Sequence, residues 1–318
     1  MSRRGIRFQA KMLELVRKYS WTIEKRAKLY KDIELSPNHV VVDVGCGTGA
    51  FTRVIAQGLD HAKGGRVIGI DRNQELLKAG RRLSSGDKAI AYKKGDVTKS
   101  LPLSDGFADR VVCQAFLWLF DDKRREKVIK EMIRVCKPGG LVAASEGAID
   151  STIDFFDGEP RLVDLWRKRS EALVSGFRKV YGYDRNLGYR LPAIFKELGL
   201  GRVRLDVYPY TDGGLLCDDR VPLEHKLDVL NYWELRYPTT FLSKVRRCKT
   251  ESEREHVIQL AEPALIAGGM SYDEVIELMQ LRRSRARKLL GKPVLVSNDA
   301  SVAFGVGFLT SGIKPQVN

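Results

Sequence analysis

An alternation of strand and helix patterns between residues 40 and 146 most constrains how this chain folds. Short β-branched runs occur at 40–44, 65–71, 89–96, 108–116 and 141–147, and helical spacing occupies 50–59, 73–83 and 122–140 between them. Strands that alternate with helices of about this length form crossover connections in a parallel sheet. We therefore predict an α/β fold with a doubly wound sheet, whose ligand lies at the carboxyl ends of the strands.

Helical periodicity dominates the second half of the chain. A charged, aromatic segment at 151–190 favours a helix and a Gly/Tyr-rich loop, followed by a helix at 191–200 and a strand at 201–210. Residues 211–298 favour helices, with a capping-box pattern at Ser271 and Glu274, whereas the Gly-rich run 301–313 favours a last strand. The segment between the last two strands is thus predicted to be an inserted helical lobe.

Helix ends are also indicated in the first half. Asp122 is a candidate N-cap for the helix that starts there, and Lys137-Pro138-Gly139-Gly140 is a candidate stop.

Composition indicates a globular protein without a membrane span. The chain has 318 residues and 43% hydrophobic content, enough for a sizeable core, and no apolar run approaches the roughly 20 residues that cross a bilayer. Its five cysteines are scattered and form no CxxC pair. That spacing argues against a disulfide framework and against a zinc knuckle. We predict a soluble, cytoplasmic protein.

Positive charge is pronounced. The net charge is +15, which favours anionic partners but is also typical of a solvated basic surface. The run LRRSRARK at 281–288 lacks the interleaved aromatics that stack on single-stranded nucleic acid. Nucleic acid is therefore a possible partner that is not favoured.

A glycine loop follows the first predicted strand. Gly45, Gly47 and Ala50 satisfy the dinucleotide fingerprint, and Asp71 lies at the distance expected for an acidic residue that holds a ribose. An NAD-binding enzyme thus remains open at this point. A P-loop is excluded, because the Gly-Lys-Ser/Thr ending is absent.

Carboxylates at the strand ends favour a different ligand. Asp43, Asp71 and Asp96 lie at the carboxyl ends of three successive predicted strands. A pyrophosphate needs amide donors and positive potential, whereas these carboxylates suit a ligand with cationic groups, a ribose and an adenine. S-adenosylmethionine is such a molecule.

The combined pattern consists of Asp43-x-Gly45-x-Gly47-x-Gly49, Asp71, Gly95-Asp96-Val97 and Lys137-Pro138-Gly139-Gly140. It resembles the class I S-adenosylmethionine-dependent methyltransferases, and the run VVCQAFLWLFDD at 111–122 resembles the stretch after the fourth strand in their small-molecule, ubiquinone-type branch. The resemblance covers residues 35–210 and the final strand, which in that family is antiparallel and inserts beside the sixth. It implies a seven-stranded, mostly parallel, Rossmann-like core at 35–210 plus 298–318. An N-terminal helical cover at 1–34 and a helical lid at 211–297 complete the predicted domains.

The resemblance also implies a cofactor site for S-adenosyl-L-methionine and its product S-adenosyl-L-homocysteine. Its predicted residues are Asp43, Gly45, Gly47, Gly49, Asp71, Arg72, Asp96, Val97 and Gln114.

Each of these residues has an implied role. The three glycines let the loop pass under the methionine portion. Asp71 would accept both ribose hydroxyls, Asp96 would accept from the adenine amino group, and the Val97 amide would donate to the ring. The Gln114 backbone would face the methionyl ammonium, and the Arg72 stem would cover the adenine.

Catalysis needs little from the protein. Methyl transfer from a sulfonium is an in-line displacement, so proximity and exclusion of water supply most of the rate, and a base matters only if the acceptor loses a proton. Glu146 is a candidate base, and its position is equally compatible with bracing a loop. Tyr183 is a candidate for a pocket wall, although Tyr181, Tyr183 and Tyr189 are more typical of packing.

Other residues are less specific. Tyr19 and Trp21 are placed where N-terminal helices of related enzymes close over the cofactor, although core packing suits Trp21 better. Asp218, Asp219 and His225 match no metal-ligand spacing, so no metal is predicted.

We therefore predict a methyltransferase for a small or medium-sized organic acceptor. The net positive charge is compatible with an acceptor that carries an anionic group. An RNA- or protein-directed methyltransferase stays open, although CQAF stands where many amino-methylating nucleic-acid enzymes have Asn-Pro-Pro-aromatic. An NAD-binding oxidoreductase and a non-catalytic binding subunit stay open as well.

Overall fold

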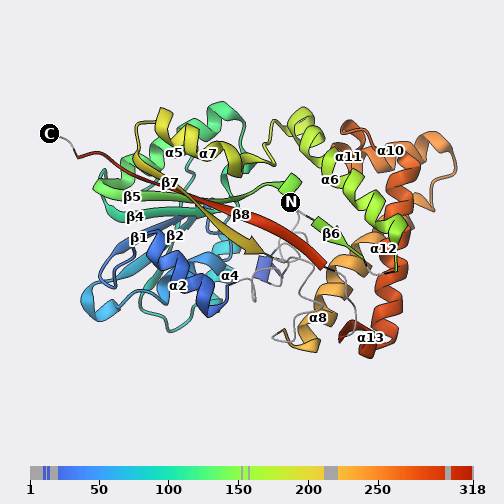
Figure 1. Ribbon diagram of the computed structural model, residues 1–318, viewed down its shortest axis with the longest axis horizontal. Helices are drawn as coiled ribbons and strands as arrows, with labels where there is room; N and C mark the ends of the chain where they lie inside the picture. The colour runs from blue at the N-terminus through green and yellow to red at the C-terminus, as the bar shows by residue number, and fades with distance from the viewer. Residues whose placement is uncertain are drawn as a thin grey trace. The chain divides into compact units, whose positions relative to one another are not determined.

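The chain forms two units, each with its own hydrophobic core, in the computed structural model (Figure 1). The first unit comprises 1–148, 186–208 and 307–318, and the second comprises 149–185 and 209–306. Residues 149–185 thus group with the helical second unit, whereas the sequence assigned them to the core. The structure describes residues 10–11, 13–14, 21–151, 153–156, 158–210, 221–297 and 302–316.

A mostly parallel sheet forms the centre of the first unit. Its strands are β1 (Val40–Val44), β2 (Arg66–Asp71), β3 (Ile90–Lys94), β4 (Ala108–Gln114), β5 (Cys136–Gly147), β7 (Gly201–Tyr210) and β8 (Val302–Ile313). The order is β3-β2-β1-β4-β5-β8, with β7 on β8, and β8 runs antiparallel to β5 through residues 307–313. The predicted seven-stranded α/β fold is confirmed, with its last strand between the fifth and sixth strands of the core.

Alternate residues of the central strands face two separate cores. Val42 belongs to the core that contains Met132 and Phe195, whereas its neighbour Val41 belongs to the core that contains Leu29 and Phe51. Such strands are apolar on both faces, as parallel strands covered by helices are. The covering helices are α2 (Ile23–Asp32), α3 (Ala50–Ala56), α4 (Gln74–Leu83), α5 (Asp122–Val135) and α7 (Leu187–Glu197). In Figure 1, α5 and α7 lie on one side of the sheet and α2 lies on the other.

Both ends of α5 differ from the sequence prediction. The N-cap is Asp121 rather than Asp122: its backbone is extended and its carboxylate accepts from the Arg124 amide at 2.8 Å. The helix ends at Val135, and residues 137–140 belong to the start of β5 rather than to a helix stop. Short 3₁₀ turns occupy η1 (His61–Lys63) and η2 (Leu117–Leu119).

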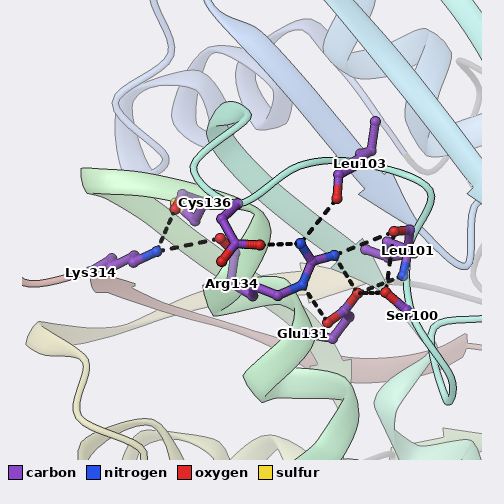
Figure 2. Close-up of polar contacts among 8 residues, drawn as sticks. Ser100, Leu101, Leu103, Glu131, Arg134, Cys136 and Lys314 are labelled. Carbon is purple, nitrogen blue, oxygen red and sulfur yellow. Dashed lines mark hydrogen bonds and ion pairs between the residues drawn. The ribbon is translucent and has the colours of Figure 1, made fainter.

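A group of polar contacts fastens the end of α5 to the loop that follows β3 (Figure 2). The Arg134 guanidinium lies 2.6 Å from the Glu131 carboxylate and donates to the carbonyl oxygens of Leu103 at 3.0 Å and Leu101 at 3.3 Å. Glu131 in turn accepts from the Leu101 amide at 2.5 Å and from the Ser100 hydroxyl at 3.1 Å. This group holds the segment just after Asp96, a predicted ligand residue.

Helices build the second unit around an apolar core that includes Leu165, Leu173, Leu265 and Leu278. They are α6 (Pro160–Tyr181), α8 (Leu223–Val229), the π-helical segment η4 (Leu230–Arg236), α9 (Tyr237–Val245), α10 (Glu251–Ala261), α11 (Pro263–Ala267), α12 (Tyr272–Gly291) and α13 (Pro293–Ser297). A 3₁₀ turn, η3 (Ile149–Ser151), and a short strand, β6 (Ile153–Phe155), which pairs with 302–304, complete it. The capping box predicted at Ser271 and Glu274 is present at the start of α12.

Within the described ranges, no helix has the length and apolar character that a membrane crossing requires.

Candidate cofactor site

The predicted ligand residues gather at one edge of the sheet. Strands β1 to β4 are mutually parallel, so their carboxyl ends share an edge. The loop after β1 (residues 45–49, hereafter the glycine loop), Asp71 at the end of β2, and Gln114 at the end of β4 all lie there. Asp96 follows β3 by two residues. The structure thus places these residues at one sheet edge, and their role as ligands stays a prediction.

Three glycines shape the glycine loop. Their φ angles are positive, at 72° for Gly45, 57° for Gly47 and 77° for Gly49, a region that other residues adopt at a cost. The missing side chains also leave space that the chain itself uses: a Cβ on Gly45 would lie 2.2 Å from the Phe116 ring, and one on Gly49 would lie 1.9 Å from the Tyr92 hydroxyl oxygen. Glycine is thus required at these two positions by packing within the protein, whatever the ligand.

Asp71 joins the glycine loop to the start of α4. Its Oδ2 accepts from the Gly47 amide at 3.0 Å, and its Oδ1 accepts from the Asn73 amide at 2.8 Å. The side chain is partly exposed. Because each carboxylate oxygen has two lone pairs, both oxygens retain capacity to accept from a ligand.

Asp96 is held in an ionised state by its own turn. Its Oδ1 accepts from the Thr98 hydroxyl at 2.7 Å and from the Thr98 amide at 3.1 Å. These hydrogen bonds, the hydroxyl first, hold the pKa of Asp96 below its usual range, and the positive charge of Arg72 acts in the same direction. Oδ2 accepts no hydrogen bond from the described part of the chain. Val97, the next residue, is buried.

Asp43 lies deeper than the other two carboxylates. It is 1% exposed, and its Oδ2 accepts from the Thr52 hydroxyl at 2.6 Å, which connects β1 to α3. Its contact with a ligand stays a prediction. Burial, with Asp43 and Asp71 nearby, raises the pKa of the Cys46 thiol well above its usual value, so the thiol stays protonated.

Glu146 braces the loop that follows β4 (residues 115–121, hereafter the β4 loop). Its Oε1 accepts from the amides of Phe116 at 2.9 Å and Leu117 at 2.6 Å. From the other side Arg125, which is 1% exposed, donates to the carbonyl oxygens of Leu117 at 3.2 Å and Phe120 at 2.5 Å. Of the two interpretations of Glu146, the bracing one has direct geometric support, and a role as base stays a prediction.

Gln114 carries a feature that sequence reasoning missed. Its backbone pairs with Ser145 of β5, and the side-chain Oε1 is buried with no hydrogen-bond partner among the described residues. A buried acceptor without a donor costs free energy, about 1–3 kcal/mol. The side chain, and not only the backbone, thus offers an acceptor at the strand edge.

A second missed contact comes from the N-terminal segment. Glu14 accepts from the Thr48 hydroxyl at 2.6 Å and from the Arg53 guanidinium at 2.6 Å, and Arg53 also donates to the Thr48 carbonyl at 2.9 Å. Leu13 lies 3.5 Å from the Cβ position of Gly47. Residues of the predicted N-terminal cover therefore contact the glycine loop.

The predicted aromatic residues pack. In the second unit Tyr183 stacks on Tyr181 with centroids 5.2 Å apart, and in the first unit Trp21 lies 5.5 Å from Phe51. Tyr189 contacts Phe308 at 4.9 Å. His225 is buried. Tyr19, Asp218 and Asp219 lie outside the described residues.

The sequence of this chain is similar to that of several known proteins. Residues 42–144 match the family model described as "Methyltransferase domain". An uncharacterised 37.1 kDa protein of a Streptomyces fradiae transposon is 34% identical over 42% of this chain and 39% of its own length. A demethylmenaquinone methyltransferase of Desulfitobacterium hafniense is 28% identical over 60% of this chain and 76% of its own length. This chain thus spans well under half of the first of these relatives.

Solved structures are similar to this chain at lower sequence identity. Phosphoethanolamine N-methyltransferase 2 of Haemonchus contortus, in complex with S-adenosyl-L-methionine, is 15% identical and superposes with a TM-score of 0.49. The superposition covers 99% of this chain and 58% of that one.

The strand order, the glycine loop and the matched model together show that this chain carries a class I S-adenosylmethionine-dependent methyltransferase domain. The cofactor of this class is S-adenosyl-L-methionine.

Proposed function

We propose that the chain transfers a methyl group from S-adenosyl-L-methionine to a small or medium-sized organic acceptor. The observation that carries this is the set of unused acceptors at one sheet edge: the buried Gln114 Oε1, the Asp96 Oδ2 and the remaining lone pairs of Asp71. A ligand with an ammonium, an amino group and a ribose diol provides donors for all three. A pyrophosphate, which carries acceptors only, provides none.

The proposed contacts follow from these positions. Asp71 binds the ribose hydroxyls, Asp96 and the Val97 amide bind the adenine, and Gln114 binds the methionyl ammonium. Arg72, which is exposed beside Asp71, covers the adenine face. The glycine loop holds the methionine portion of the cofactor, and Asp43 holds the end of β1 from which this loop starts.

Positioning is the main contribution of this chain to the rate. When bound, the sulfonium donor supplies the methyl group for in-line displacement. The β4 loop is fixed by Glu146 on its amides and by Arg125 on its carbonyls, so the residues beside the donor keep one geometry. Holding two reactants in that way contributes several kcal/mol to lowering a barrier.

Two observations support a small acceptor. The relatives include several demethylmenaquinone methyltransferases. In addition, Arg282 and Arg285 of the basic run at 281–288 are buried, so they do not contribute to a surface for RNA. We also propose a cytoplasmic location, with which the free thiols of Cys46, Cys113, Cys136 and Cys248 are compatible.

Calorimetric titration with S-adenosyl-L-homocysteine and with NADH tests the cofactor assignment. We expect micromolar binding of the first compound and none of the second. Asp71→Ala should weaken the binding of S-adenosyl-L-homocysteine at least about 100-fold, because two hydrogen bonds to a charged group are lost.

Asp87→Ala is the matched control. Asp87 makes a similar turn contact, accepting from the Ala89 amide at 2.9 Å, but it precedes β3 and so lies at the opposite sheet edge. Its variant should bind like the wild type. Tight binding of NADH alone would refute the proposal, as would unchanged affinity in Asp71→Ala.

A further inference from the structure

The basic run at 281–288 turns part of its charge into the interior of the second unit. Arg282 is 3% exposed and Arg285 is 6% exposed, although both lie in a segment that reads as a solvated surface. They are three residues apart on α12 and therefore share a helix face. Buried guanidinium groups need an explanation, because moving a charge out of water is costly unless it is paired.

Aromatic rings surround these charges. The guanidinium carbons of Arg169 and Arg282 lie 4.7 Å and 5.1 Å from the centroid of the same ring, Trp166. Trp166 contacts Phe156 at 5.3 Å, and Arg285 lies over Phe156 at 5.3 Å. Ring faces attract cations by about 0.5–2 kcal/mol each, but they do not neutralise them.

Carboxylates lie beside some of these guanidinium groups. Glu234 forms a bidentate ion pair with Arg282, with its Oε2 2.9 Å from Nε and its Oε1 3.2 Å from Nη2. Glu262 accepts from the Tyr237 hydroxyl. Arg169 makes no hydrogen bond and no ion pair within the part of the chain that the structure describes. Burial, followed by the like charge of Arg282, lowers the pKa of Arg169 to about 10; Arg185 acts in the same direction, and the carboxylates of Glu262 and Glu234 oppose the shift only in part.

We propose that Arg169, together with the neighbouring Arg282 and Arg185, forms a binding site for an oxyanion group of a small ligand, a carboxylate or a phosphate. A planar guanidinium with its donors unused matches two oxygens of such a group, and charge-assisted pairs of this kind are about twice as strong as neutral hydrogen bonds. The aromatic rings beside it suit the apolar part of the same ligand. This site does not depend on the proposed methyl transfer.

Thermal unfolding of the full chain tests the site with two probes, inorganic phosphate and benzoate, in a zwitterionic buffer. We expect one or both to raise the wild-type Tm saturably, by about 2–4 °C at ten times the dissociation constant. Potassium chloride at matched ionic strength should produce no saturable rise. Phosphate alone would indicate a phosphate-bearing ligand, and benzoate alone would indicate an aromatic carboxylate.

Arg169→Met should abolish the anion-dependent rise and leave the Tm in anion-free buffer at or above the wild-type value, because a like charge is removed. Arg167→Met is the matched control: Arg167 is exposed on the same helix, and its variant should respond like the wild type.

Two results would overturn the proposal. One is an equal rise in Arg169→Met and wild type, and the other is a wild type that responds to neither probe beyond chloride. Binding of S-adenosyl-L-homocysteine, measured on the same variant by calorimetry, should be unchanged, which separates this site from the cofactor site.

Discussion

The two units use charge in opposite ways. In the first, carboxylates lie at the ends of buried strands, and backbone amides or hydroxyls hold them, as at Asp71 and Asp96. In the second, guanidinium groups such as Arg169 and Arg282 lie among aromatic rings between helices. The sheet edge supplies backbone donors, which suit anions of the chain itself. Helix faces supply only side chains, so a buried charge there depends on another side chain or a ligand.

The two units also differ in how they use glycine, and this difference leads to the largest expected effect on stability. In the first unit glycine permits a turn, whereas in the second it permits close contact of two helices: a Cβ on Gly176 of α6 would lie 1.7 Å from the Ala264 carbonyl oxygen of α11. In Gly176→Ala the added methyl group would clash with a backbone carbonyl, which cannot move aside as a side chain can. We expect it to lower the free energy of unfolding by about 3 kcal/mol or more, measured by urea denaturation.

Gly291→Ala is the control for helix propensity. Gly291 ends α12 and has nothing within 4 Å of its Cβ position, so alanine there should be neutral or slightly stabilising. If Gly176→Ala unfolded at the wild-type urea concentration, α6 and α11 would not pack as the structure shows.

The buried ion pair of the second unit gives the next largest effect. Glu234→Gln removes the charge of the carboxylate that pairs with Arg282, whose side chain is 4% exposed. Removing one member of a buried pair is strongly destabilising, and because Glu234 is 17% exposed we expect about 2 kcal/mol, measured by urea denaturation.

Glu277→Gln provides the contrast, because Glu277 lies on α12, the helix that also carries Arg282. Glu277 pairs with Arg161 at 2.6 Å, but both side chains are largely in water, at 39% and 56% exposure. Its loss should be hard to measure. Equal effects of the two substitutions would contradict the view that burial, rather than pairing, makes the second unit depend on its charges.

This difference also explains what the sequence could predict. The strand ends were found because β-branched runs end at or close to Asp43, Asp71 and Asp96, and parallel strands bring their ends together. The buried Arg282 and Arg285 were read as surface. Their position between Leu278 and Leu289, at helical spacings of four, three and four, was the signal that assigns them to the buried face.

Long-range partners were beyond such patterns. Phe116 and Tyr92 fill the space beside Gly45 and Gly49, and Glu14 binds Thr48 across 34 positions of the chain. No local period encodes these contacts, because they depend on how separate elements pack.

A carboxylate of the first unit that is largely buried, Glu131, gives the smallest expected effect, and that effect depends on pH. The Arg134 guanidinium, more than any other group, holds the pKa of Glu131 below its usual range, and the amide of Leu101 adds to this. A carboxyl whose pKa is lower in the folded state stabilises the fold above its unfolded pKa of about 4.3. That contribution is lost as the pH falls through the lower, folded value.

Glu131→Gln should therefore cost about 1 kcal/mol of unfolding free energy at pH 7, and the gap to the wild type should narrow towards pH 3. Urea denaturation at the two pH values measures both quantities. Glu126→Gln, which removes an exposed pair with Lys130 on the same helix, should show no such narrowing. If the difference in unfolding free energy between Glu131→Gln and the wild type were the same at both pH values, the hydrogen bonds of Glu131 to Leu101 and Ser100 would stabilise the fold independently of its negative charge. The charge of such a carboxylate in the first unit would then contribute less to stability than its contacts indicate.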